Sequence, residues 1–256
     1  MVAEVEILKV FLLVLVRFSG LIVTAPVLGS NNFPVIAKVG LVGLSAFAVT
    51  PTIGALAEPL PAEAFEFGLM AAGELLIGMA IGLVMTIVFA AIQLAGQMMD
   101  MQSGFGLMNV FNPALETQFP IFGFFYFILA VLFLLTTNGH HLMIQALVST
   151  FERIPLGGFA PDVDLMGQAA AWGGVMFYDA ILIAAPVAGA MMLAYMVMGI
   201  MGRVVPQIHL FVIGFPLTIA ASLAVVAFSI GVYLAFLEGL FEGMFRNVDQ
   251  LIDGLG

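Results

Sequence analysis

The sequence predicts an all-α membrane protein made of long, kinked helices that pair as hairpins. Hydrophobic residues make up 63% of the 256 residues and charged residues only 9%, whereas soluble domains carry about 25% charged residues. The apolar residues gather in runs, several of them longer than the ~20 residues with which a helix crosses a bilayer. Prolines and short polar segments interrupt these runs, which predicts kinks and hairpin turns.

Composition also excludes three classes of protein. A soluble globule of this length buries only about three-quarters of its chain surface, too little to hide so many apolar residues. The same apolar content excludes a disordered chain. Six Lys and Arg against 16 Asp and Glu give a net charge of −10, which repels phosphate, so we expect no nucleic acid partner. Because the chain has no cysteine, disulfides and thiolate metal sites are not expected.

Seven apolar runs follow one another, at residues 7–28, 35–53, 67–95, 119–135, 142–151, 165–200 and 210–237. The first run carries Lys9 near its start and one charge near its middle, Arg17. It is not a cleavable signal peptide, because Glu4 and Glu6 stand where a basic leader would be. The second run has Pro51 near its end, which favours a stop or a kink there.

The middle of the chain alternates overlong runs with breaks. The 29 residues of the third run would form a helix of about 43 Å, longer than the ~30 Å hydrocarbon core. The polar residues 97–118 follow, and Pro120 then suits the first position of the fourth helix. A break at residues 136–141 precedes the fifth run, which is too short to span a membrane alone.

The sixth run is too long for one straight crossing and contains Asp179 and Pro186. The tail, residues 239–256, has apolar residues at helical spacing and acidic residues on its other face, which predicts an amphipathic helix. We expect residues 1–256 to form a single domain ending in this tail. Broken helices at membrane depth need protein or a water-filled cavity around them, so the runs predict hairpins that pack against partners or line a pore.

Away from the ends of the apolar runs, three charged residues stand inside them: Arg17, Glu74 and Asp179. A charge in such a run is costly unless it is paired. One interpretation is an ion or proton path. The other, which we favour, is that Arg17 is neutralised by a carboxylate or by helix-end carbonyls and fixes the packing, because a proton relay needs a chain of such groups.

We expect no metal, no cofactor and no catalytic site. His140 and His141 follow Asn138 and Gly139 at a break between apolar runs, and a metal site there would need further ligands in register. A turn whose polar side chains satisfy freed backbone groups is the simpler interpretation. Motifs of metalloproteases and of nucleotide-binding loops are absent from the sequence, so the chain is not expected to be an enzyme.

A glycine-rich, aromatic stretch follows the third run and predicts either a pore loop or plug or an ordinary connecting loop. Its candidate residues are Ser103, Gly104, Phe105, Gly106, Met108 and Phe111. Unbranched methionine side chains repack around variable partners, and glycine allows a loop to move. The sequence alone does not favour one interpretation over the other.

Several motifs together resemble the FliR family of flagellar export proteins. They are VRFSG at residues 16–20, APV at 25–27, AGQ at 95–97, NGH at 138–140 and GRVVPQIH at 202–209. The positions that match the family motifs include Pro26, Gly139, His140, Arg203, Pro206 and Gln207. One departure is His209, where many relatives carry Asn; both side chains form hydrogen bonds.

The resemblance implies a subunit of the type III secretion export gate in the bacterial inner membrane, at the flagellar basal body and partly on the periplasmic side. Proteins similar to FliR pack in a helical ring with FliP and FliQ subunits, around a channel for unfolded export substrates, with FlhB and FlhA at its base. The segment that matches the family plug is residues 103–112, with Phe105, Met108 and Phe111 as the pore-closing side chains.

The sequence leaves two alternatives open. One is a stand-alone secondary transporter for a small solute that uses Arg17, Glu74 and Asp179; it would predict inverted repeats, which the sequence lacks. The other is the equivalent gate subunit of a virulence secretion system, the SctT family. The stretch GFPL at residues 214–217 favours the flagellar family.

Overall fold

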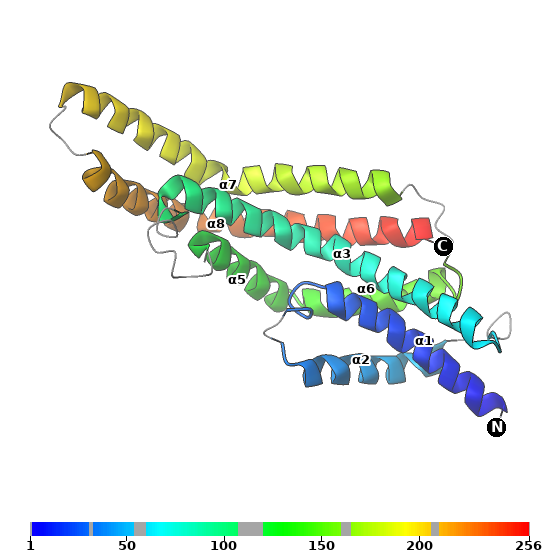
Figure 1. Cartoon of the computed structure of the whole chain (residues 1–256). Coiled ribbons are helices and arrows are strands. Elements are labelled where there is room, and N and C mark those ends of the chain that lie inside the picture. The colour runs from blue at the N-terminus through cyan, green and yellow to red at the C-terminus, as the bar shows by residue number, and fades with distance from the viewer. Residues whose placement is uncertain are drawn as a thin grey trace. The chain divides into compact units, whose positions relative to one another are not determined.

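The computed structural model describes residues 2–30, 33–53, 60–106, 120–159, 165–205 and 210–255. Within these ranges the regular structure is helical, with one short 3-10 helix and no strand, which confirms the all-α prediction. The elements, shown in Figure 1, are α1 (Val2–Thr24), α2 (Val35–Val49), η1 (Thr50–Thr52), α3 (Ala64–Ser103), α5 (Ile121–Thr136), α6 (Gly139–Arg153), α7 (Leu165–Val204) and α8 (Leu210–Leu255).

In the part of the chain that the structure describes, five helices are long and apolar enough to cross a membrane, or up to six if α5 and α6 count as one broken span. Four of the five are α1, α3, α7 and α8; the fifth combines α2 with η1. This confirms a membrane protein with several candidate spanning helices.

Most of the described helices are longer than the apolar runs that predict them, and α3 and α8 extend furthest. α3 has 40 residues and continues through the polar segment as far as Ser103. α8 has 46 residues and joins the seventh run to the tail without interruption. Pro186 lies inside α7, which bends midway in Figure 1, as expected where proline removes a backbone hydrogen bond.

The fourth and fifth runs are separated by a short break. Asn138 has a left-handed backbone with φ of 57°, a conformation that asparagine tolerates better than most residues. α6 begins directly after it, at Gly139. The sequence places a break at residues 136–141, but His140 and His141 already lie in the first turn of α6, so the break is shorter than predicted.

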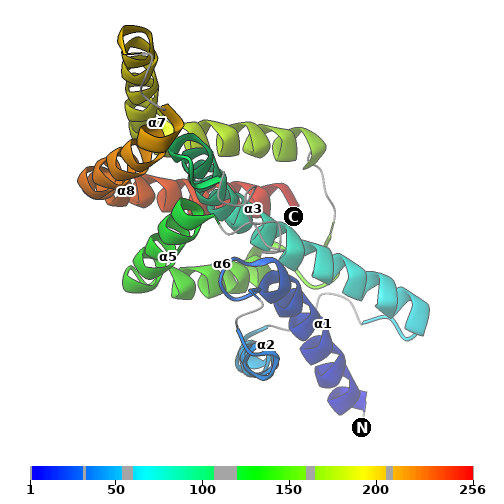
Figure 2. The same cartoon turned by 60° about the vertical axis from the view of Figure 1, so that its left-hand side comes forward.

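The chain divides into two compact units, and α3, α7 and α8 contribute residues to both. Unit 1 comprises the described residues within Met1–Ile87, Leu135–Ala170 and Phe241–Gly256, and unit 2 those within Val88–Leu134 and Ala171–Leu240. In unit 1, α2 packs on α1 and lies beside it in Figures 1 and 2.

Each unit has its own apolar core. In unit 1 the end of α8 buries Met244, Val248, Leu251 and Ile252, the apolar stripe that the spacing of the tail predicts. In unit 2 the core takes side chains from four helices: Phe89, Ile92 and Ala95 of α3, Phe122 and Tyr126 of α5, Val187 and Met191 of α7, and Tyr233 and Leu237 of α8.

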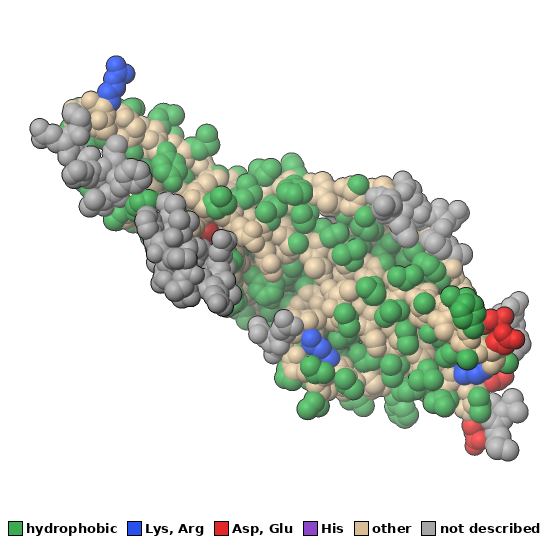
Figure 3. Space-filling model, in the orientation of Figure 1, with side chains coloured by type: hydrophobic (Ala, Val, Ile, Leu, Met, Phe, Trp, Pro, Cys, Tyr) green, Lys and Arg blue, Asp and Glu red, His purple; other side chains and the backbone are tan. Residues whose placement is uncertain are grey.

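Much apolar surface remains outside these cores. Hydrophobic side chains cover a large part of the face drawn in Figure 3, with few charged side chains among them. In the most apolar stretch of each helix, only 22% of the residues of α7 and 17% of those of α8 are buried. A monomer in water rarely exposes apolar patches of this extent, so this surface meets lipid or other chains.

Candidate functional site

The charged centre of unit 1 is a buried ion pair between α1 and α3. Arg17 Nε donates to Oε2 of Glu74 at 2.5 Å, and both side chains are fully buried. The other guanidinium nitrogens donate to Oγ1 of Thr150 (2.8 Å) and to the carbonyl of Ile154 (3.2 Å). The guanidinium carbon also lies 4.2 Å from the centre of the Phe151 ring, a cation–π contact.

The second carboxylate oxygen of Glu74 is satisfied as well. The backbone amide of Gly157 donates to its Oε1 at 2.9 Å. Gly157 has φ of +78°, a backbone that glycine adopts without strain. The ion pair therefore joins α1, α3, the end of α6 and the turn that follows α6.

Glycines let α1 and α3 approach closely enough for this pair to form. A Cβ added at Gly78 would collide with the carbonyl of Arg17, and one added at Gly82 with Oγ1 of Thr24. On the facing helix, a Cβ at Gly20 would meet backbone atoms of α3. The Gly-x-x-x-Gly spacing of α3 is thus used inside the chain, as small residues are in packed membrane helices.

Asp179 does not join this cluster. It lies in unit 2, on α7, where its side chain is half-buried, and it makes no ion pair or hydrogen bond within the described part of the chain. The partners of Arg17 are one carboxylate, one hydroxyl and one carbonyl rather than a series of ionisable groups. This arrangement suits a packing role better than a proton relay.

The C-terminal end of α3 is anchored in unit 2 by Asp100. Its carboxylate accepts hydrogen bonds from the backbone amides of Phe122 (3.1 Å) and Gly123 (3.4 Å), at the start of α5. A Cβ at Gly96 would fall on the backbone of Gly123, so the two helices cross in close contact. Asp100 is not among the residues predicted from the sequence, because its place in a polar stretch gives no hint that it caps another helix.

The first residues of the predicted plug continue from this anchor. The carbonyl of Ser103 accepts a hydrogen bond from Oγ1 of Thr218 on α8 at 2.9 Å, and Tyr195 of α7 donates to the carbonyl of Gln102 at 2.6 Å. Gly104 has φ of +97° and lies against the ring of Phe215. Together with α5, which Asp100 caps, α7 and α8 thus hold the chain at the point where α3 ends.

The predicted pore-closing residues are only partly described. The ring of Phe105 packs edge-to-face on Phe122, with 5.4 Å between ring centres. Gly106 is also described, and both residues are helical. Met108 and Phe111 lie outside the described residues.

The positions that match the family motifs serve the backbone and the helix ends. Pro26 is buried in the turn after α1, and its carbonyl accepts a hydrogen bond from the amide of Leu28 at 2.7 Å. Gly139 is buried at the start of α6. The His140 ring lies 4.1 Å from that of His141.

Arg203 is exposed in the last turn of α7, where a cation suits the helix end. Pro206 and Gln207 lie outside the described residues.

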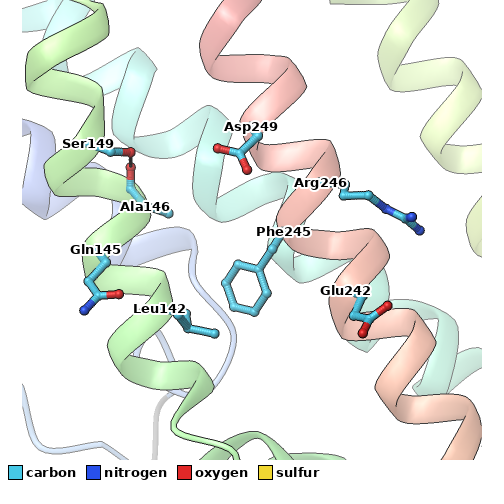
Figure 4. Close-up of a pocket in the computed structure, with 8 residues that line it drawn as sticks. All are labelled: Leu142, Gln145, Ala146, Ser149, Glu242, Phe245, Arg246 and Asp249. Carbon is cyan, nitrogen blue, oxygen red and sulfur yellow. Dashed lines mark hydrogen bonds between the residues drawn. The ribbon is translucent and has the colours of Figure 1, made fainter.

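An open groove of about 550 Å³ lies in unit 1 between α6 and the end of α8. It is lined by Leu142, Gln145, Ala146, Ser149, Glu242, Phe245, Arg246 and Asp249. Figure 4 shows the Phe245 ring between the two helices. No group of three or more His, Cys, Asp or Glu side chains suited to a metal occurs among the described residues.

Comparison with known proteins covers nearly the whole chain. Residues 8–244 match the family described as bacterial export proteins, family 1. The chain is 31% identical to the flagellar biosynthetic protein FliR of Escherichia coli K12 over 94% of this chain and 92% of that protein. It is 31% identical to FliR of Bacillus subtilis over 98% of both chains, and 27% identical to FliR of Aquifex aeolicus over 98% of this chain and 96% of that protein.

Proposed function

The chain belongs to the FliR family of bacterial export proteins, and on that premise we propose that it is the FliR-type subunit of a flagellar type III protein export gate. The observation that carries this proposal is the family match over residues 8–244 together with relatives that align along nearly their full length. All the relatives named above are flagellar biosynthetic proteins. The match favours the flagellar system over a virulence system and over a stand-alone transporter.

In this proposal the chain assembles with FliP-like and FliQ-like subunits around a channel for unfolded export substrates, with FlhB-like and FlhA-like subunits at its base. We place this complex in the bacterial inner membrane at the flagellar base, partly on its periplasmic side, and the candidate spanning helices support a membrane location. The exposed apolar faces of α7 and α8 supply surface for lipid and neighbouring subunits. The role is structural, with no catalytic step.

The proposed plug is the segment over residues 103–112, which begins where α3 ends. Its first residues are held by Thr218 and packed on Phe122, so the described anchor gives the segment a fixed base. Apolar and methionine side chains at a constriction can exclude water and deform around a passing polypeptide. Phe105, Met108 and Phe111 would provide these side chains.

Assembly is tested by expressing the tagged chain together with FliP-like and FliQ-like subunits and purifying the complex in mild detergent. We expect the three proteins to co-purify and to elute together on size exclusion. A tagged chain that elutes alone in lipid-like detergent, from cells that contain both other subunits, would contradict the export-gate assignment.

The plug is tested in the assembled complex. Deletion of residues 103–112 is expected to make the complex conduct small ions. Replacement of Phe105, Met108 and Phe111 by serine is also expected to raise the conductance of small ions, without shortening the chain. The wild-type complex in the same planar bilayer is the reference, and conductance that stays at its closed level in both variants would refute the plug.

A further inference from the structure

Asp179 is a carboxylate on a helix that is otherwise apolar around it. It lies between Tyr178 and Ala180 in α7, a helix long and apolar enough to cross a membrane. One face of α7 packs in unit 2 and buries Ala180 and Ile183. The side chain of Asp179 is half-buried, at the border between this packed face and the exposed face of the helix. A carboxylate in this setting needs a partner.

The described chain supplies no such partner. Asp179 makes no ion pair or hydrogen bond within it. The sequence holds six Lys and Arg residues, and four of these are engaged elsewhere: Lys9 with the carbonyl of Pro61, Arg17 with Glu74, Lys38 with the carbonyl of Gly29, and Arg153 with Asp249 and Asp253.

The two remaining cations do not serve either. Arg203 lies on the same helix, 24 residues further on, which is about 36 Å along the axis at 1.5 Å per residue. Arg246 lines the groove of unit 1. With 16 acidic residues and a net charge of −10, the chain is short of positive charge.

The surface next to Asp179 is open. Val175, Tyr178 and Leu182, which precede or follow it by one helical turn or less, are exposed to 50%, 62% and 40%. A Cβ added at Gly174 or Gly189 would meet no other atom within 4 Å. A second helix can therefore approach this face of α7 closely, as happens at small residues in membrane bundles.

We infer that Asp179 pairs with a lysine or arginine on a membrane helix of a neighbouring gate subunit, which packs on the face formed by Val175, Tyr178, Leu182 and Gly189. This inference rests on the proposed function. Charge complementarity selects the occupant: lipid tails cannot neutralise a carboxylate, and a chain with net charge of −10 needs its cations from outside. The paired charge also fixes the register of the two helices, because any shift would leave both charges unpaired.

The test uses the assembled complex with the FliP-like and FliQ-like subunits. Asp179→Leu and Asp179→Lys are expected to lower the amount of partner recovered with the tagged chain, the lysine variant by at least about tenfold because it sets two like charges against each other. Glu66→Lys is the matched control, since it makes the same charge change at an exposed site in the first turn of α3. It is expected to leave recovery unchanged.

Asp179→Leu, which adds no charge, keeps the test decisive if Asp179→Lys folds poorly, and a second-site screen identifies the partner residue. Each Lys and Arg in the membrane helices of the partners is changed to Asp in the Asp179→Lys background. One of these changes is expected to restore recovery, which identifies the partner residue; if none does, the inference is overturned. If both Asp179 variants recover as much partner as the wild-type chain does, the inference is also overturned and this face of α7 is assigned to lipid. If the wild-type chain recovers no partner at all, the proposed function fails instead.

Discussion

The guanidinium of Arg17 and the carboxylate of Glu74 form an ion pair that is sealed from solvent and joins residues 57 positions apart in the sequence. Every group around the pair is used: Thr150 and Ile154 accept from the guanidinium, and the amide of Gly157 donates to the carboxylate. Because burial removes both charges from water, the pair is favourable only as a complete set of contacts.

Removal of either charge alone is expected to destabilise unit 1. Glu74→Leu or Arg17→Met leaves one buried charge unpaired, which typically costs about 3–5 kcal/mol. The double variant Arg17→Met with Glu74→Leu removes both charges and is expected to recover most of this loss. Thermal unfolding of the purified chain in detergent measures all three.

Arg153→Ala is the control for this series. Arg153 pairs with Asp249 and Asp253 but its side chain is 41% exposed, so its loss is expected to cost about 1 kcal/mol or less. A double variant less stable than either single variant would show that the pair does not act as a unit.

A side chain at Gly78 is expected to force α1 and α3 apart. In Gly78→Ala the new methyl group would fall on backbone atoms of α1, the carbonyl of Arg17 and the amide of Leu21. Backbone atoms cannot rotate away as a side chain can, so the helices must separate, at a cost of about 1–3 kcal/mol.

Gly68→Ala, on the same helix, is the matched control because nothing lies within 4 Å of its added methyl group. It is expected to stabilise α3 by about 0.5–1 kcal/mol, since alanine favours the helix over glycine. The difference in melting temperature between the two variants measures the effect. Equal melting temperatures would argue against the helix contact.

Sequence patterns were sufficient to predict the helical class, the break near Asn138 and the burial of one face of the tail, because each depends on local spacing or on one residue type. They did not show which carboxylate pairs with Arg17. Glu74 and Asp179 stand in equally apolar runs, and the choice between them is made by the packing of α1 on α3 through Gly78 and Gly82.

The C-terminal end of α3 is a second feature that local composition did not predict. The third apolar run ends at residue 95, yet α3 continues through the polar residues 97–103. The polar side chain of Asp100 accepts hydrogen bonds from the backbone amides of Phe122 and Gly123. This contact joins segments more than 20 residues apart in the sequence. Local composition cannot distinguish a polar residue that faces solvent from one that caps a distant helix.

Loss of the Asp100 carboxylate is expected to loosen the start of α5. Asp100→Ala leaves the amides of Phe122 and Gly123 without their acceptor, at a cost of about 0.5–2 kcal/mol. Asp100→Asn keeps one carbonyl oxygen as an acceptor and is expected to lose less. Hydrogen–deuterium exchange reports the effect directly, as faster exchange in the peptide that contains Phe122. Unchanged exchange in Asp100→Ala would contradict the capping role.

A side chain at Gly104 is expected to strain the junction between α3 and the proposed plug. The φ of +97° at Gly104 is a conformation that L residues rarely adopt, and an added Cβ would also press on the Phe215 ring. Gly104→Ala is therefore expected to lose about 1–2 kcal/mol of stability. In the assembled complex we expect the same change to alter closed-state ion conductance, because it displaces the base of the plug.

Gly106→Ala is the matched control two residues away, where the added methyl group makes ordinary contacts, and it is expected to change stability by less than about 0.5 kcal/mol. If the two alanine variants melt and conduct alike, the left-handed turn at Gly104 does not set the position of the segment.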